Sequence, residues 1–133
     1  NITAFFKKKA AGQLVEGGVY LDANLDESHF LTLLDTTKRV SDYMIDLRSK
    51  EVRDVKILIP EKMEVSSLPA PFQIHTAWVD FCRTYSQTGN QIVMHKECVI
   101  HHRRVPRSEI PAWNKIISDW GGACYEVVVL KEK

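Results

Sequence analysis

Two of the histidines fall in a pattern that could bind a metal ion. His95 and His101 lie on one face of an expected strand, with Glu97 between them. A strand rises about 3.3 Å per residue, so alternate side chains lie about 6.6 Å apart and only neighbouring members of the series could share an ion. A zinc ion would need a further ligand, such as Cys82 across from Glu97. We expect surface histidines on a solvated face here, with no metal and no cofactor. The five histidines are His29, His75, His95, His101 and His102.

Cys124 is the residue whose surroundings most invite a nucleophilic interpretation. A catalytic thiol typically sits at a helix N-terminus, which lowers its pKa, and a His and an Asp then activate and orient the attack. Cys124 instead follows the expected helix, and none of the residues after it is His or Asp. A permuted triad could recruit His75 or His95, because triads are defined by geometry. We expect a packing cysteine and no catalytic residue. A small cysteine hydrolase using Cys124 stays open as the second alternative.

Basic and aromatic side chains supply the candidate binding residues. Residues 101–107 form the one dense basic stretch, and arginine can hold a phosphate or polyanion in bidentate fashion. No aromatic residues are interleaved for base stacking and the net charge is +1, so we expect no nucleic-acid partner. Trp78 is expected on the more polar face of a hairpin, where it could stack on a sugar. The candidates are Trp78, Arg103, Arg104 and Arg107.

Composition bounds the class of protein. A chain of 133 residues with ordinary apolar and charged content predicts one soluble globular domain. No apolar run approaches the roughly 18 residues needed to span a bilayer, so we expect no membrane insertion. The chain starts at Asn1 without an initiator Met or a signal peptide, which we interpret as the cut end of a larger protein. The three cysteines lack the Cys-x-x-Cys spacing typical of zinc sites.

A β-hairpin is the clearest structural signal. Residues 78–85 and 92–100 are rich in β-formers and flank Gly89-Asn90, a pair that favours a two-residue turn. Pairing around that turn places Val79 opposite Ile100, Phe81 opposite Cys98 and Tyr85 opposite Met94. The other face carries Asp80, Cys82 and Thr84 opposite Val99, Glu97 and His95. Cys82 and Cys98 are then free thiols on opposite faces, and a bridge between them would require a bulge that shifts the register.

Further strands and one helix complete the pattern. The residue pattern predicts strands at 19–25, 43–47, 52–59 and 65–68, with 72–76 leading into the hairpin. The continuously apolar run at 127–130 predicts a closing strand that is covered on both faces. In the strand at 52–59, Val55, Ile57 and Ile59 share one face. The one helix is expected at about 108–120, with Ser108 as N-cap, Pro111 in the first turn and Gly121-Gly122 as the stop. Its buried stripe is Ile110, Trp113, Ile117 and Trp120.

These elements predict a mainly β fold: an antiparallel β-sandwich-like domain with one C-terminal amphipathic helix packed on it. Residues 1–35 form a leading segment and first strand that belong to the same unit, and residues 36–133 form the β-sandwich-like domain proper.

The order of landmarks resembles one C-terminal domain of bacterial transglutaminase-like (papain-type) proteins that also carry an N-terminal β domain of unknown function. The matching landmarks run through most of the chain: Val19-Tyr20-Leu21, Arg39, residues 54–60, Val65, Leu68-Pro69, residues 89–92, Val105-Pro106 and the helix through Trp113. Trp113 stands where the family tends to have Tyr.

The resemblance implies a non-catalytic accessory domain, with the Cys-His-Asp machinery upstream in a separate catalytic domain of the same chain. It implies a role in domain packing or in substrate or envelope contacts, and a location in the periplasm, in the cell envelope or outside the cell. The first alternative is an independent binding module, for a glycan or for a protein such as an envelope protein, that uses Trp78.

Overall fold

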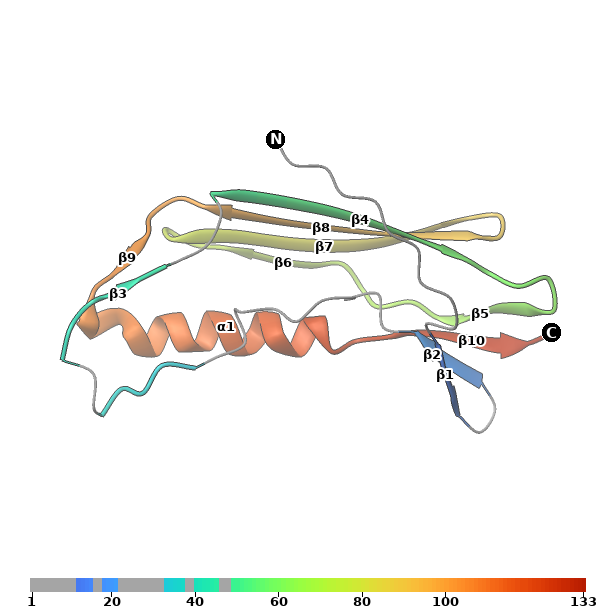
Figure 1. The fold of residues 1–133 in the computed structure, drawn as a ribbon, viewed down its shortest axis with the longest axis horizontal. Coiled ribbons are helices and arrows are strands. Elements are labelled where there is room, and N and C mark those ends of the chain that lie inside the picture. Colours follow the sequence, from blue (N-terminus) through green and yellow to red (C-terminus); the bar gives the residue numbers. More distant parts are fainter. Residues whose placement is uncertain (1–11, 16–17, 22–32, 38–39, 46–48) are drawn as a thin grey trace.

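The computed structural model describes residues 12–15, 18–21, 33–37, 40–45 and 49–133 (Figure 1). Its elements, in chain order, are β1 (Gly12–Val15), β2 (Gly18–Leu21), β3 (Tyr43–Met44), β4 (Lys50–Leu58), β5 (Met63–Ser67), β6 (Phe72–His75), β7 (Val79–Thr88), β8 (Gln91–Ile100), β9 (Arg104–Val105), α1 (Ile110–Cys124) and β10 (Val128–Glu132). The fold is mainly β, with antiparallel sheets and one C-terminal helix, as predicted. Within the described residues, no helix combines the length and the apolar character that a membrane crossing requires.

The hairpin of β7 and β8 has the predicted register. Val79 pairs with Ile100, Phe81 with Cys98 and Tyr85 with Met94, and all three predicted pairs of the other face also form. Gly89 has a φ of 59°, in the left-handed region that glycine adopts without strain, so the turn falls where the sequence predicts it. Cys82, Cys98 and Cys124 are all free thiols.

A long four-stranded sheet in the order β4-β8-β7-β6 forms one layer of the molecule (Figure 1). β4 pairs with β8 along its whole length, and β6 is the edge strand before the hairpin, as predicted. Burial alternates along β4, so that Val55 and Ile57 are half-buried on the inner face while Asp54 and Lys56 are exposed on the outer face. Alternation of this kind indicates a sheet with one covered face.

The second layer is divided between the helix and a smaller sheet. In Figure 1, α1 lies under one half of the long sheet, and the sheet ordered β1-β2-β10-β5 lies under the other half. Two cores result. The helix-side core joins Val79, Phe81, Ile100 and the buried face of α1, and the sheet-side core joins Ile59, Ile92, Val128 and Leu130. Sheet therefore faces sheet over one half of the molecule, and a helix takes the place of the second sheet over the other half.

The helix begins and ends later than residues 108–120. A 3₁₀ turn occupies Arg107–Glu109, α1 runs from Ile110 to Cys124, and Ser108 is not the N-cap. Gly121 and Gly122 lie inside the helix and do not stop it. Burial of the apolar face supplies the reason: Trp120, Ala123 and Cys124 all pack inward, which offsets the low helix propensity of the two glycines. The predicted stripe is confirmed, with Ile110, Trp113, Ile117 and Trp120 each at most 2% exposed.

A buried arginine holds the C-terminal end of the helix against the sheet. Arg83, on the inner face of β7, is 2% exposed. Its guanidinium donates hydrogen bonds to the carbonyl of Ala123 in α1 and, at 3.0 Å, to the carbonyl of Ala70. Glu126 lies 3.6 Å from the same group, and the ring of Tyr85 lies beneath it. A cation at this position also complements the partial negative charge of the helix end.

β10 occupies a position that no local pattern indicates. It is inserted between β2 and β5, antiparallel to both. Gly18 of β2 is required there, because a Cβ at this residue would lie 2.5 Å from the carbonyl oxygen of Leu130. β1, which pairs with β2, was not predicted.

Several predictions are only partly covered by the described residues. The strand expected at 19–25 is described as far as Leu21, and Gly17, residues 22–28, His29 and Arg39 lie outside the described residues. The strand expected at 43–47 is described as β3, which pairs with β9, and residues 46–48 lie outside. Leu34, in the loop that precedes β3, is held by the side chain of Asn114 in α1, which exchanges two hydrogen bonds of 2.8 Å with the Leu34 backbone.

Candidate functional site

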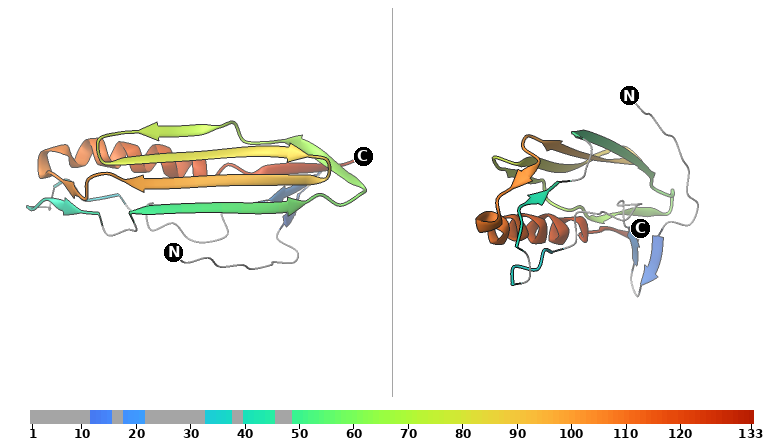
Figure 2. Two further views of the ribbon diagram at one scale, coloured as in Figure 1. Left: turned by 90° about the horizontal axis from the view of Figure 1, so that it is seen from above. Right: turned by 60° about the vertical axis from the view of Figure 1, so that its left-hand side comes forward.

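The outer face of the long sheet carries the polar side chains that could do chemistry. Figures 1 and 2 show this face on the side opposite α1, and no described helix or strand covers it. The cross-strand register brings side chains from four strands into rows on this face. Its titratable members include Lys50, Asp54, His75, Asp80, His95 and Glu97.

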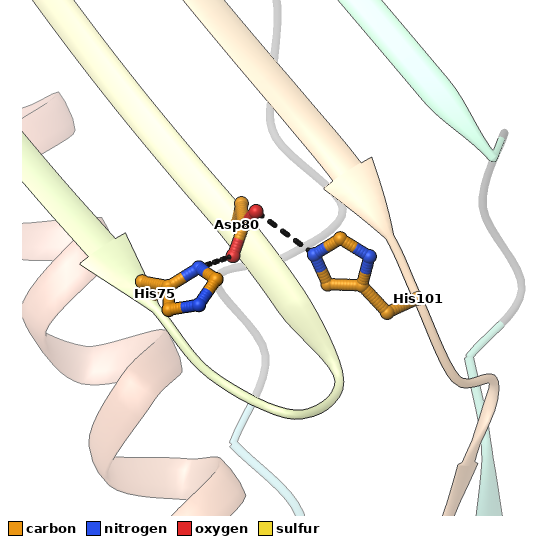
Figure 3. A group of neighbouring side chains, drawn as sticks. All are labelled: His75, Asp80 and His101. Atoms are coloured by element: carbon orange, nitrogen blue, oxygen red, sulfur yellow. Dashed lines mark hydrogen bonds and ion pairs between the residues drawn. The ribbon is translucent and has the colours of Figure 1, made fainter.

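One cluster on this face consists of His75, Asp80 and His101, which we call the His-Asp-His cluster (Figure 3). The Asp80 carboxylate lies between two imidazoles: one oxygen contacts Nδ1 of His75, and the other lies 2.8 Å from Nε2 of His101. One ligand atom from each residue falls within 4.8 Å of the other two. The side chains of His75, Asp80 and His101 are 76%, 34% and 38% exposed, so the cluster is open to solvent.

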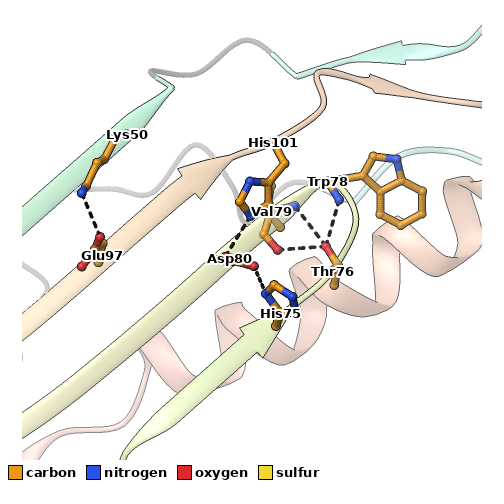
Figure 4. Close-up of polar contacts among 8 residues, drawn as sticks. All are labelled: Lys50, His75, Thr76, Trp78, Val79, Asp80, Glu97 and His101. Atoms are coloured by element: carbon orange, nitrogen blue, oxygen red, sulfur yellow. Dashed lines mark hydrogen bonds and ion pairs between the residues drawn. The ribbon is translucent and has the colours of Figure 1, made fainter.

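Backbone structure fixes where these three residues stand. His75 ends β6 and pairs directly with Asp80 of β7. The hydroxyl of Thr76 accepts the N–H of Val79 at 3.0 Å and donates to the Val79 carbonyl at 2.9 Å, which ties the connecting turn together (Figure 4). His101 follows β8, and its N–H donates to the carbonyl of Trp78 at 2.7 Å. A threonine-closed turn and one strand pair thus position the cluster.

The two histidines shift the acid–base behaviour of Asp80. Burial on the sheet would raise the pKa of its carboxyl, but the hydrogen bonds and charges of His101 and His75 outweigh burial, and the pKa lies below its ordinary value. Asp80 is therefore a carboxylate at neutral pH.

A second network on the same face surrounds His95. Its Nδ1 lies 2.6 Å from Asp54 on β4, and its Nε2 lies 3.4 Å from Glu97, which also pairs with Lys50 at 3.3 Å. The hydrogen bond with Asp54, followed by that with Glu97, raises the pKa of His95 against the opposing effect of burial. Lys50 and then His95 lower the pKa of Glu97.

The sequence pattern grouped His95, Glu97 and His101 as possible ligands of one metal ion, and the structure separates His101 from the other two. His95 and Glu97 do meet, but His101 joins Asp80 and His75. Sequence reasoning considered His101 along its own strand and missed a partner on β6. The signal that could have found the cluster is the pairing of β6 with β7, because that register sets His75 beside Asp80.

The basic candidates hold the β3–β9 end of the molecule together. Arg103 donates to the Ile45 carbonyl at 3.0 Å and to the Ser49 hydroxyl at 2.9 Å. Arg104 pairs with Asp42, whose other oxygen accepts the backbone N–H of Arg107. The backbone bond from Arg107 and then the bond from Arg104 lower the pKa of Asp42. These contacts favour a structural role for Arg103 and Arg104, and the side chain of Arg107 is exposed.

Trp78 does not lie on the polar face of the hairpin. It belongs to the turn before β7, and its ring packs edge-on against Trp113 at 6.4 Å, next to the helix-side core. Only part of the ring therefore remains for a ligand.

The thiols are poorly suited to nucleophilic attack. Cys124 is the last residue of α1, not a residue beyond it, and is 6% exposed within the helix-side core. Burial, and then the charge of Glu51, raise the pKa of Cys98 to about 12. Burial also raises the pKa of Cys82, with further contributions from Glu97 and Asp80. A nucleophilic cysteine needs the opposite shift.

Comparisons with known proteins place this fold in a family. Residues 17–130 match a family model described as "Domain of Unknown Function with solved-structure structure (DUF3858)". No curated protein matches the sequence at a significant level. Among solved structures, the crystal structure of a "putative protease" from Parabacteroides distasonis is similar, with a TM-score of 0.66 and 16% identity. The match covers 87% of this chain but 24% of that chain, and at this identity it establishes the fold alone.

Proposed function

The chain belongs to this family of domains of unknown function, and from that premise we propose that it is a non-catalytic accessory domain of a longer transglutaminase-like or protease-type protein. Its role in this proposal is structural: it packs against an upstream catalytic domain of the same chain and holds that domain in position.

One observation carries the proposal. The same fold makes up 24% of the chain of a protein named as a "putative protease", so it occurs there as one part of a much longer polypeptide. The order of landmarks in the present sequence, which resembles the C-terminal domain of transglutaminase-like proteins, supports the same interpretation.

The state of the thiols supports a non-catalytic role. Burial raises the pKa of Cys98 to about 12, and Cys124 is buried among aromatic and aliphatic side chains. A hydrolase using Cys124 would need its thiolate to reach a substrate, and a side chain in that core does not meet the substrate without unfolding of the helix end.

The exposed edge of the long sheet offers a surface for the neighbouring domain. Val52 and Leu58, on the outer face of edge strand β4, are 48% and 70% exposed. The register sets half-buried Val99 and Val93 of β8 diagonally beside them. Exposed apolar side chains on an edge strand are a liability unless something covers them. In this proposal the upstream domain does so.

The test compares the longer protein with the 133-residue chain by hydrogen–deuterium exchange. We expect the amides of β4 to exchange more slowly in the longer protein. Replacing Val52 and Leu58 by Lys should remove that difference, whereas replacing Ser86 by Lys, on the same face of β7, should preserve it. Equal exchange of β4 in both proteins would refute the docking surface. Amide or ester hydrolysis by the chain alone, abolished by Cys124→Ala, would refute the non-catalytic role.

We extend the proposal to location: the periplasm, the cell envelope or the medium of a bacterium. Support comes from the resemblance to exported proteins, and fractionation of cells that express the native longer protein tests it. A glycan or an envelope protein as a further partner is a weaker candidate, because Trp78 packs against Trp113.

A further inference from the structure

We propose that the His-Asp-His cluster binds one transition-metal ion of the Zn²⁺ class on the outer face of the sheet. The ligands are ring nitrogens of His75 and His101 and the carboxylate of Asp80. This inference is independent of the proposed accessory role.

The donor set selects the class of ion. Two imidazole nitrogens and one carboxylate suit borderline metals such as Zn²⁺, whereas Mg²⁺ and Ca²⁺ prefer sites made of oxygen atoms. Two neutral histidines and one carboxylate carry a net charge of −1, which favours a divalent cation.

The spacing of the ligand atoms is close to what such an ion requires. Zinc bonds of about 2.0–2.1 Å in tetrahedral geometry separate ligand atoms by about 3.4 Å. The ligand atoms of the cluster lie within 4.8 Å of one another, so they need to approach by at most about 1.4 Å. Rotation of His75 can supply this movement, because its side chain is 76% exposed.

In the absence of metal, the ring nitrogens that would bind the ion, Nδ1 of His75 and Nε2 of His101, both contact the Asp80 carboxylate. On metal binding, a neutral imidazole carries its hydrogen on the other ring nitrogen, so that the ion replaces the two hydrogen bonds to Asp80. The backbone need not move, because the strand pair and the Thr76 turn already fix the three residues. With three protein ligands, water can occupy a fourth position on the exposed side.

On the sheet rows beside the cluster, the positive charge of Lys50 is paired with a carboxylate. Lys50 lies beyond Val99 in the row of Asp80 and contacts Glu97 (Figure 4). Glu97 itself lies diagonally across from Asp80 and adds negative charge.

The test is calorimetric titration of the chelator-treated, dialysed 133-residue chain with ZnCl₂, alongside MgCl₂ and CaCl₂. We expect one Zn²⁺ per chain and no binding of Mg²⁺ or Ca²⁺. His75→Ala, His101→Ala and Asp80→Asn should each weaken Zn²⁺ binding by at least about tenfold. Circular dichroism and urea unfolding verify folding of each variant, and the exposure of His75 makes His75→Ala the variant least prone to unfold.

Matched controls separate this site from adventitious binding. His95→Ala and His102→Ala remove histidines outside the cluster, and Cys82→Ser removes the thiol on the same face of β7 as Asp80; all three should bind Zn²⁺ with unchanged affinity. Co²⁺ should give a visible absorption band with the wild type that is lost in His75→Ala/His101→Ala. Absence of saturable binding, or equal affinity in that double variant, would overturn the proposal.

Discussion

Arg83 offers the sharpest test of how the two layers are joined, because a charged group is buried where helix meets sheet. Replacing it by Met keeps a long apolar stem but removes both hydrogen bonds to backbone carbonyls, the buried one to Ala123 and the half-buried one to Ala70. Hydrogen bonds from a charged donor contribute roughly 1.5–3 kcal/mol each, so the two together contribute roughly 3–6 kcal/mol.

Opposing effects reduce that figure. Burial of a guanidinium costs several kcal/mol, which the methionine variant recovers. Within the described residues, Nε of Arg83 has no hydrogen-bond partner, and the Ala123 carbonyl retains a bond of 3.2 Å from the N–H of Glu126. We therefore expect Arg83→Met to lower the free energy of unfolding by about 2 kcal/mol. Arg83→Ala also removes buried methylenes worth about 0.8 kcal/mol each, which brings its loss to about 4 kcal/mol.

The assay is urea unfolding followed by tryptophan fluorescence, since Trp113 and Trp120 belong to the helix-side core and Trp78 packs against it. Amide exchange at Tyr125 and Glu126 should accelerate in both variants, because these amides bond the last carbonyls of α1. Glu126→Gln serves as the control: its carboxylate is 46% exposed, so the loss should stay below about 1 kcal/mol. An Arg83→Met protein as stable as the wild type would refute the reasoning, because desolvation would then outweigh the hydrogen bonds.

Two further predictions concern the glycines and the outer face. Measured by urea unfolding, Gly18→Ala should lower the free energy of unfolding by roughly 1–3 kcal/mol, because the new Cβ would meet the Leu130 carbonyl. Gly122→Ala, in open space on α1, should raise the free energy of unfolding by roughly 0.5–1 kcal/mol. Equal effects of the two substitutions would contradict the close approach of Gly18 to Leu130. The raised pKa of His95 adds stability below its unfolded pKa, and that stability is lost as the pH rises through the folded pKa. His95→Gln should therefore reduce Tm more at about pH 5.5 than at about pH 8, and the opposite order would contradict the pairing with Asp54. Glu97, whose pKa is lowered, loses its contribution only at more acidic pH, outside this window.

The hairpin and the faces of the strands could be predicted from the sequence because they depend on neighbours along the chain. Alternation of apolar and polar residues fixes which face is buried, and Gly89-Asn90 fixes where the chain reverses. A one-residue slip would turn every side chain to the wrong face. The helix stripe from Ile110 to Trp120 follows from the same kind of local repeat.

The ends of the helix were decided by tertiary contacts. Local rules make Ser108 a cap and Gly121-Gly122 a stop, yet the helix continues to Cys124. The free energy of burying Ala123 and Cys124 and of binding Arg83 to the last turn exceeds the glycine penalty of roughly 1 kcal/mol per residue. No local pattern contains that information, because Arg83 lies 40 residues away from Ala123.

The sequence alone determined the local framework: a hairpin in one register, alternating faces and one amphipathic helix. Only the tertiary structure placed β10 between β2 and β5, turned Trp78 onto Trp113, and brought His101 to Asp80 and His75. The physical reason is range: periodicity and turn residues act over a few positions, whereas the order of strands and the meeting of side chains depend on burial summed over the whole fold.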